Sequence, residues 1–555
     1  MKTSILQLLY LVLLFSITSC GVNRSLKDRP NLDSISEIDT VRTVHNDSLL
    51  TIGKNTLLKN KYGVWELYLE GDALERGLIN GSLTKELMAK QEIAIMTKIE
   101  SLVPSKSYQK FLSKMVKFFN RKMYKYVPEE YKQEIYGISR FSLEKYDFFA
   151  PAYVRAMYLH GAHDIGHALQ DLMLVGCTSF AAWDGKTSDG KLLLGRNFDF
   201  YAGDDFAEEK IVAFINPTEG HKFMMYTWGG FIGAVSGLNI QGLSVTINAG
   251  KSKIPLLAKT PISLVAREIL QYAGTIDEAV AIAKKRKVFV SEAIMIGSSK
   301  DHKAVLIEVS PNNFGVFDVE NSDHLVCSNH FQSAAYNSDR RNTKAIEESH
   351  SAYRFKRMQE LLDSSDKLDP EKAVAILRNR NGLNGKKIGL GNEKAINQLL
   401  AHHGIIFKPE ELKVWVSANP YQLGEFIAYD LNDAFNKFER GNVKNSVSNV
   451  QATISKDEFV NSQEFSDYEV FRKLSQQIEL NLLSGQEIKE RDLQKLQILN
   501  PYYWKSYSIT GDYYYEREDY KMAIINYKKA LRLEITTLSD RKRLIKRIKK
   551  SYRKL

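Results

Sequence analysis

The stretch from Gly176 to Phe200, GCTSFAAWDGKTSDGKLLLGRNFDF, holds two mainly apolar runs on either side of a turn-rich centre. Asp189-Gly190 in that centre is a strong signal for a two-residue hairpin turn. Folding the chain there as two antiparallel strands places Cys177 opposite residues 198–201. The stretch therefore predicts a hairpin at the heart of a β-rich domain, with one of the chain's three cysteines at its open end.

Three chemically reactive groups meet in the predicted hairpin. Asp199 lies within cross-strand reach of Cys177, and Arg196 precedes it by three residues on the same strand. A nearby arginine lowers the pKa of a thiol, and the thiolate is the form that attacks carbonyl groups. A carboxylate can orient the amine or imidazole that carries the proton. The group thus predicts nucleophilic catalysis, with the base still to be identified.

Histidines are the first candidates for that base. The segment YLHGAHDIGHALQ, residues 158–170, offers a possible metal site or a Cys–His pair through His160, His163, Asp164 and His167. Its two glycines make a poor helix, which argues against a helical metal-binding motif there. His402-His403 is the other candidate, although packing is the simpler role for that pair.

Cutting the chain would supply a base in another way. If the Gly176–Cys177 bond is cleaved, the new α-amino group of Cys177, with a reference pKa near 8, lies beside its own thiol. Glycine before the cysteine suits such a cut, because it allows unusual backbone conformations and leaves the carbonyl unshielded. We therefore expect self-cleavage between Gly176 and Cys177.

Five motifs in order resemble a known group of enzymes: GCTSFAAW, GRNFDF, GLSVTINAG, CSNHF and SAYRFKR. They resemble the N-terminal-nucleophile (Ntn) cysteine hydrolases, and within them the acyl-coenzyme A:6-aminopenicillanate acyltransferase family. Choloylglycine hydrolases, acid ceramidase and N-acylethanolamine acid amidase are wider relatives of that family. The upstream segment EGDALERGLINGSL also resembles a glycine-punctuated segment of these acyltransferases. The resemblance covers about residues 61–430.

The resemblance implies a role for each residue near the hairpin. It makes Cys177 the nucleophile, exposed by self-cleavage after Gly176. Arg196 would favour the thiolate, and Asp199 would hold the free amine. An ordinary ion pair between Arg196 and Asp199 is the structural alternative.

Further residues are implied by the downstream motifs. Asn329, in SNHF, resembles the asparagine that donates to the oxyanion, and Asn248, in TINAG, is a second candidate donor. Both could instead be strand-end caps. Arg354, in SAYRF, resembles the arginine that completes the polar network of the bile-salt hydrolases. Cys327 is expected near the site, which leaves a Cys177–Cys327 disulfide open as an alternative. No metal and no organic cofactor is implied.

The segment pattern predicts an α+β protein. Short strands bounded by Gly, Asp and Asn alternate with helices over residues 177–430, and the resemblance implies an αββα four-layer sandwich of the Ntn-hydrolase type there. Residues 61–176 are expected to be mostly helical, residues 431–460 a linker, and residues 461–555 helical. The last part matches the spacing of one tetratricopeptide (TPR) repeat, which would pack on its own chain, through Tyr507, Gly511, Tyr514, Ala523, Tyr527 and Ala530.

The N-terminus, MKTSILQLLYLVLLFSITSCG, has a positive residue, an apolar run and small residues before Cys20. This pattern is typical of a secretory signal, and its end resembles a bacterial lipoprotein signal in which the cysteine is acylated. An ordinary signal peptide that happens to contain Cys20 is the alternative. We therefore expect a signal peptide over residues 1–20, a tether over residues 21–60, and a lipid-anchored protein of the cell envelope, outside the cytoplasm.

The net charge of +11 is unevenly distributed. Residues 540–555 hold nine Lys/Arg against one Asp, so the rest of the chain is near neutral. A basic helical tail is most often a solvated face, and contact with anionic lipid headgroups is the next interpretation. Nucleic acid is not an expected partner. The hydrophobic share of 44% excludes wholesale disorder.

These observations predict a self-processing amidohydrolase or acyltransferase. Cys177 would cleave or transfer an amide-linked acyl group through a thioester. Anchoring at a membrane makes an N-acyl lipid or N-acyl amino acid a plausible substrate. Bile-salt or β-lactam amide hydrolysis at the same site is one alternative. A non-catalytic surface-anchored binding protein, which recruits a protein partner through its TPR-like region, is the other.

Overall fold

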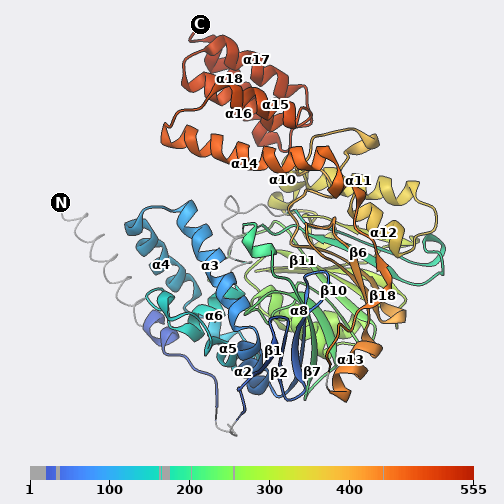
Figure 1. Ribbon diagram of the computed structural model, residues 1–555. Coiled ribbons are helices and arrows are strands. Elements are labelled where there is room, and N and C mark those ends of the chain that lie inside the picture. Colours follow the sequence, from blue (N-terminus) through green and yellow to red (C-terminus); the bar gives the residue numbers. More distant parts are fainter. Residues whose placement is uncertain are drawn as a thin grey trace.

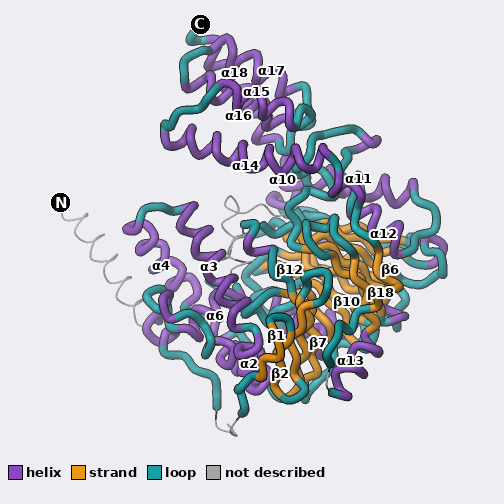
Figure 2. The backbone as a smooth tube through the Cα atoms, in the orientation of Figure 1, coloured by secondary structure: helices purple, strands orange, loops and turns teal. Residues whose placement is uncertain are grey.

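Two stacked sheets form the centre of the computed structural model, which describes residues 21–32, 38–161, 164, 176–201, 203–253, 255, 257–441 and 443–555. Figure 1 shows the strands between two groups of helices, and Figure 2 shows the same arrangement by secondary structure. Side chains from the facing sides of both sheets share one buried apolar cluster, including Phe214, Leu194, Ile405 and Phe407.

The larger sheet has eleven strands in the order β1-β2-β3-β4-β7-β8-β9-β10-β11-β12-β13. Neighbouring strands are antiparallel except β4 and β7, which run parallel. The strands are β1 Thr43–Asn46, β2 Leu49–Ile52, β3 Asn55–Lys59, β4 Trp65–Gly71, β7 Ile211–Pro217, β8 Phe223–Thr227, β9 Ser236–Asn239, β10 Leu243–Ala249, β11 Glu292–Ser298, β12 Lys303–Ser310 and β13 Asn313–Phe317.

The smaller sheet has seven strands in the order β14-β5-β6-β15-β16-β17-β18, all antiparallel. Alternation along its strands separates two faces: Leu194 of β6 points to the sheet-sheet cluster, whereas Leu193 joins the cluster on the outer side. The strands are β14 His324–Cys327, β5 Thr178–Ala182, β6 Leu193–Phe198, β15 His403–Lys408, β16 Lys413–Ser417, β17 Phe426–Asp430 and β18 Asn449–Ile454.

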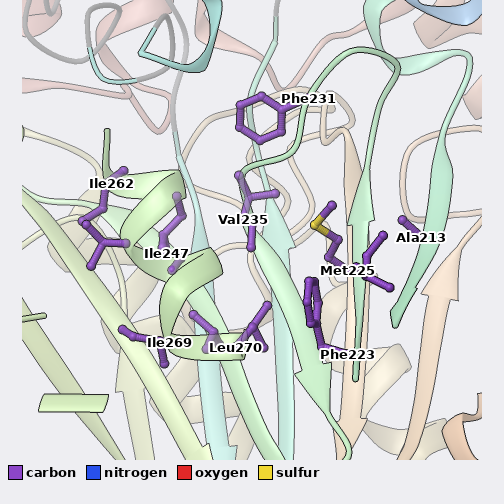
Figure 3. Close-up of a cluster of buried hydrophobic side chains, with 14 of the residues drawn as sticks. Ala213, Phe223, Met225, Phe231, Val235, Ile247, Ile262, Ile269 and Leu270 are labelled. Atoms are coloured by element: carbon purple, nitrogen blue, oxygen red, sulfur yellow. The ribbon is translucent and has the colours of Figure 1, made fainter. Parts of the chain in front are cut away.

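Helices cover the outer face of each sheet. Helix α8 (Ile262–Tyr272) packs on the larger sheet through Ile262, Ile269 and Leu270, which Figure 3 shows facing strand residues such as Ile247. Helix α9 (Ile276–Lys285) joins the same cluster. Helices α11 (Ser351–Ser364) and α12 (Pro370–Leu377) cover the smaller sheet, and α10 (Arg340–Glu348) precedes them. The predicted α+β four-layer sandwich is thus confirmed.

Among the described residues between β4 and the hairpin, the α-helices are α2 Ala73–Leu83, α3 Lys85–Leu102, α4 Lys106–Asn120, α5 Glu129–Ser139 and α6 Ala152–His160. Helices α2 and α5 cross closely because glycines face each other at the crossing. A Cβ built on Gly77 would lie 2.2 Å from the Glu134 carbonyl oxygen, and one on Gly137 would lie 2.5 Å from the Leu78 nitrogen. Close backbone approach therefore explains the glycine-punctuated segment seen in the sequence.

Two expected boundaries differ from the structure. The expected tether, residues 21–60, contains β1, β2 and β3, which extend the larger sheet beyond β4. The expected linker, residues 431–460, contains helix α13 (Leu431–Arg440) and edge strand β18. Many of their polar residues lie within the short strands β1 and β18, while Leu431, Phe435 and Phe438 of α13 pack in the sheet-sheet cluster. Average composition over these stretches hid their apolar periodicity.

The C-terminal helices are α14 Gln463–Ser484, α15 Glu490–Leu499, α16 Trp504–Glu516, α17 Tyr520–Leu531 and α18 Leu538–Tyr552, and Figure 1 shows them stacked at one end of the molecule. In the pair α16–α17, a Cβ on Gly511 would lie 2.6 Å from the Tyr527 ring. The unit packs on its own chain through an apolar cluster shared with Leu399, and Lys505 pairs with the buried Glu393 at 2.6 Å. Its assignment as a TPR repeat stays a prediction.

In the part of the chain that the structure describes, no helix is long and apolar enough to pass through a bilayer. The expected signal peptide and the expected lipidation site, Cys20, lie outside the described residues.

The α2–α5 crossing yields a stability test. We expect Gly77→Ala to lower the free energy of unfolding by about 1–3 kcal/mol, because the added methyl group meets backbone that cannot move aside independently. The better helix propensity of alanine offsets this by at most about 1 kcal/mol. Gly185→Ala is the control, since its Cβ would meet only Asp323 Oδ2 at 3.9 Å. Equal denaturation midpoints for the two variants would contradict this packing.

Candidate active site

The predicted hairpin forms with the predicted register. Strands β5 and β6 pair antiparallel with Thr178 opposite Asn197, so Cys177 at the next position faces Phe198. Strand β14 flanks β5 on its other side, with Cys327 opposite Ser179. The open end of the hairpin therefore gathers residues from three neighbouring strands of the smaller sheet.

Cys177 is buried, with 1% of its surface exposed. A guanidinium nitrogen of Arg196, Nη2, donates to the Cys177 Sγ at 3.7 Å. Burial raises the pKa of the thiol to about 11, while Arg196 acts in the opposite direction. Arg196 thus favours the thiolate as expected, but desolvation outweighs it, and the thiol of this uncut chain is protonated at neutral pH.

Arg196 joins the two sheets. From β6 it donates to the Val235 carbonyl oxygen at 2.9 Å and to Ser236 Oγ at 2.6 Å, both at the start of β9. Its other terminal nitrogen donates to the Ile247 carbonyl oxygen in β10. Among the described residues no ion pair joins Arg196 to Asp199, so the ordinary ion-pair interpretation is wrong.

Asp199 follows β6 and is fully buried. Its Oδ2 accepts a hydrogen bond from Gln398 Nε2 at 3.3 Å, and its backbone carbonyl accepts one from the Gly176 nitrogen at 3.3 Å. Its Oδ1 has no hydrogen-bond partner among the described residues. Burial raises the pKa of the carboxyl to about 7, against the opposing charges of Arg354 and Arg196. Asp199 can therefore exchange a proton near neutral pH.

Arg354, on α11, holds the backbone on the other side of the thiol. Its Nη1 donates to the Cys177 carbonyl oxygen at 2.7 Å and to Thr178 Oγ1. Its Nη2 donates to Asn329 Oδ1 at 2.6 Å. The structure thus places Arg354 in direct contact with Cys177 and Thr178.

Both candidate oxyanion donors border the same cluster. Asn329 Nδ2 donates to the Ala249 carbonyl oxygen at 2.9 Å. Asn248 accepts from Ser179 Oγ at 3.0 Å, and its Nδ2 donates to the Cys327 carbonyl oxygen at 3.5 Å. In this state each Nδ2 donates one hydrogen to a backbone carbonyl, and its second hydrogen is the one that could serve an oxyanion.

Gln398 is a site residue that the sequence did not indicate. Its Nε2 donates to the Gly176 carbonyl oxygen at 2.7 Å. A Cβ on Gly176 would lie 2.4 Å from that nitrogen, so a larger residue would displace the Gln398 amide from this position. The two residues are 222 positions apart, and Gln398 lies in a loop before β15. No local pattern could have revealed the pair.

The segment with four metal-ligand candidates has a structural role at His160. Its Nδ1 bonds to the Ala156 carbonyl oxygen at 2.8 Å, and its Nε2 accepts from the Ile232 nitrogen at 3.0 Å. Asp164 accepts from the Ile262 nitrogen at 2.8 Å, whereas His163 and His167 lie outside the described residues. Within the described ranges, no three His, Cys, Asp or Glu side chains are grouped to hold a metal ion.

His402 and His403 lie behind Arg196 rather than beside the thiol. Their Nδ1 atoms are 2.8 Å apart, and His403 Nε2 bonds to Ser236 Oγ, the acceptor of Arg196, at 2.9 Å. Burial lowers the pKa of both rings well below the usual range. These contacts give the pair a positioning role in this state and not the role of base.

Cys177 and Cys327 are both free thiols, so the alternative of a disulfide between them is wrong. Cys327 Sγ donates to the Ser328 carbonyl oxygen at 3.4 Å, and burial raises the pKa of its thiol. The charge of a Cys177 thiolate would raise the pKa of Cys327 further, because like charges repel.

A sequence profile of the family Acyl-coenzyme A:6-aminopenicillanic acid acyl-transferase matches residues 185–419. The resemblance expected from the motifs is thus confirmed over this segment, which contains Arg196, Asp199, Asn248, Asn329 and Arg354. An uncharacterized protein of Archaeoglobus fulgidus is 28% identical over 282 residues, which are 46% of this chain and 45% of that protein. Protein dcd1B of Dictyostelium discoideum is 25% identical over 274 residues, which are 46% and 52% of the two chains. The chain therefore spans about half the length of these relatives.

Two solved structures are similar at low identity. The N-acylethanolamine-hydrolyzing acid amidase ortholog of Caenorhabditis elegans is 19% identical with a TM-score of 0.30, covering 42% of this chain and 93% of its own. A mutant of the conjugated bile acid hydrolase of Clostridium perfringens is 16% identical with a TM-score of 0.31, covering 46% and 92%.

The buried histidine at the α6–core contact gives a pH prediction. Burial lowers the pKa of His160 to about 4, whereas an unfolded histidine titrates near 6.5. Between these values the unfolded state binds more protons, so the free energy of unfolding falls as pH falls, by at most about 1.4 kcal/mol per pH unit from this residue. We expect His160→Gln to reduce the slope of stability against pH between pH 6.5 and 4.5. Equal slopes in wild type and His160→Gln would contradict the assignment.

Proposed function

We propose that this protein is a self-processing amidohydrolase or acyltransferase with Cys177 as its nucleophile. The observation that carries the proposal is the convergence on one buried thiol of the Arg196 guanidinium, the Asp199 carboxyl and a hydrogen-bonded Gly176 carbonyl. Similarity to an acyltransferase family over residues 185–419 supports it. A role limited to binding would not require this cluster.

Self-cleavage would come first. The Cys177 Sγ attacks the Gly176 carbonyl carbon, and Asp199 accepts the thiol proton. The C–N bond between Gly176 and Cys177 then breaks, and the proton passes to the leaving nitrogen. Water hydrolyses the resulting thioester, which leaves a carboxylate on Gly176 and a free thiol and α-amino group on Cys177.

Turnover would use the new N-terminus. The α-amino group takes the thiol proton, Sγ attacks the carbonyl of an amide-linked acyl group, and the proton passes to the leaving amine. Asn248 and Asn329 are the proposed donors to the oxyanion, where removal of one such donor costs roughly 3–4 kcal/mol of transition-state stabilisation. Water or a second amine then takes the acyl group from the thioester.

The substrate class follows from this chemistry and from the sequence. We infer an acyl amide, either a small molecule or a lipid, and propose an N-acyl lipid or N-acyl amino acid because of the lipoprotein-like signal ending at Cys20. Lipid anchoring in the cell envelope remains a proposal that rests on that signal. Radiolabelled lipid incorporation into wild type and Cys20→Ser tests it directly.

Intact mass is the decisive test of self-cleavage. We expect the wild type to yield two fragments with a new N-terminus at Cys177, and Cys177→Ala to stay as one chain. Cys327→Ala is the matched control, because it removes the neighbouring buried thiol and should still be cut. A wild-type chain that stays uncut would contradict the proposed function.

The fragments should remain together under native conditions. Strands β1 to β4 belong to the upstream fragment, and β4 pairs along its whole length with β7 of the downstream fragment. Size-exclusion chromatography of the cut protein therefore gives one peak, and separate peaks would contradict the pairing.

The pKa of Asp199 predicts the pH dependence of self-cleavage. Because the carboxylate is the proton acceptor and its pKa is raised to about 7, the cleavage rate should rise with pH up to about 7 and then level off. Asp199→Asn should cut more slowly and lose this rise. The rate is measured by transferring freshly translated chain to buffers between pH 5.5 and 8.5. A rate that falls as pH rises through 7 would contradict the role given to Asp199.

A further inference from the structure

We propose that Gln398 is a catalytic residue of self-cleavage, which donates the hydrogen bond that stabilises the oxyanion formed on the Gly176 carbonyl. This inference rests on the proposed function, since it concerns the first reaction at the same thiol. It assigns to a single glutamine a role that differs from those of the two asparagines proposed for turnover.

The contacts of the Gln398 amide match this role. An amide nitrogen has two hydrogens, and Gln398 Nε2 has two acceptors: the Gly176 carbonyl oxygen at 2.7 Å and Asp199 Oδ2 at 3.3 Å. The side chain is 2% exposed, so water does not compete strongly for these bonds. One side chain thus touches both the carbonyl to be attacked and the carboxylate that accepts the proton.

The backbone around Gln398 is fixed to the strand that carries the site. Asn197 of β6 donates through Nδ2 to the Ile396 carbonyl oxygen at 3.0 Å, and the Asn397 nitrogen donates to the Asn379 carbonyl oxygen at 2.8 Å. Asn397 Oδ1 in turn accepts from the Leu399 nitrogen at 2.9 Å. A donor held in this way needs little reorganisation when charge develops on its acceptor.

The other polar groups are directed elsewhere in the uncut chain. The Asn329 and Asn248 amides donate to the carbonyl oxygens of Ala249 and Cys327. Arg354 holds the Cys177 carbonyl oxygen, on the side of the leaving nitrogen. Among the described side chains, Gln398 is therefore the one with a hydrogen bond to the Gly176 oxygen.

The reaction places charge on the atom that Gln398 contacts. When Sγ bonds to the Gly176 carbon, the electron pair of the C=O double bond moves to the oxygen, 2.7 Å from Nε2. The pair returns when the C–N bond breaks and the thiol proton reaches the leaving nitrogen. After water hydrolyses the thioester, Gly176 ends in a carboxylate, and no further oxyanion forms on the atom that Gln398 contacts. Loss of the Gln398 amide should therefore slow self-cleavage far more than turnover.

The first experiment compares two buried glutamines in the full-length chain. Gln398→Leu should slow self-cleavage by about 10²–10³-fold, the usual effect of removing one oxyanion donor. Gln271→Leu is the matched control, because Gln271 Nε2 also donates to a backbone carbonyl, of Glu219 at 2.8 Å, and to a carboxylate, of Glu130 at 2.7 Å. The control should cut at the wild-type rate. Turnover by the fraction of Gln398→Leu that has matured should fall by a clearly smaller factor than self-cleavage, because only the contact with Asp199 is then lost.

Gln398→Glu supplies a readout that a purely structural role would not move. Its carboxylate cannot donate, but its protonated form can, so cleavage should be slow at pH 8 and should recover toward the wild-type rate as pH falls. This variant also decides the question if Gln398→Leu does not fold. The inference about Gln398 would be overturned if both variants were cut at the wild-type rate, or if cleavage and turnover were slowed equally. In either case, a cut wild-type chain would still uphold the proposed function. Uncut wild type would overturn both.

Discussion

The buried guanidinium of Arg196 is the interaction on which the site depends. It lies between the two sheets, bonds to backbone carbonyls of Val235 and Ile247, and reaches the Cys177 sulfur with the same nitrogen that binds Ile247. An arginine without these acceptors could not remain there, because an unpaired buried charge is strongly destabilising. The sheets must therefore stack with β6 against β9 and β10, and that stacking places the thiol.

The same burial determines the chemistry of the uncut chain. It raises the pKa of the Cys177 thiol to about 11 and that of the Asp199 carboxyl to about 7. Within the proposed mechanism, the nucleophile is held protonated beside a group able to take its proton near neutral pH. Release of an α-amino group by cleavage then supplies a second acceptor, so that the processed site depends less on Asp199 as a base.

The sequence predicted the features that depend on local pattern, and it missed those that depend on distant contacts. The β5–β6 register follows from alternation and one turn, and it brings the Asp199 carbonyl oxygen within 3.3 Å of the nitrogen of Gly176, next to Cys177. Asn329 and Arg354 were found only because ordered motifs resemble a family. Gln398 meets Gly176 across 222 residues and belongs to no motif. The stretches expected as tether and linker contain short strands and an amphipathic helix. Their few apolar residues do not stand out in the average composition of these stretches.

Gly176 has more than one reason to be a glycine. The sequence indicates backbone freedom and an unshielded carbonyl, and the structure adds a close neighbour, because a Cβ on Gly176 would lie 2.4 Å from the Gln398 amide nitrogen. A larger residue there would push that amide from both the Gly176 oxygen and Asp199. Glycine at position 176 thus leaves the space in which the Gln398 amide stands. The residue at position 176 therefore also affects the Asp199 carboxylate, because the Gln398 amide bonds to both the Gly176 oxygen and Asp199.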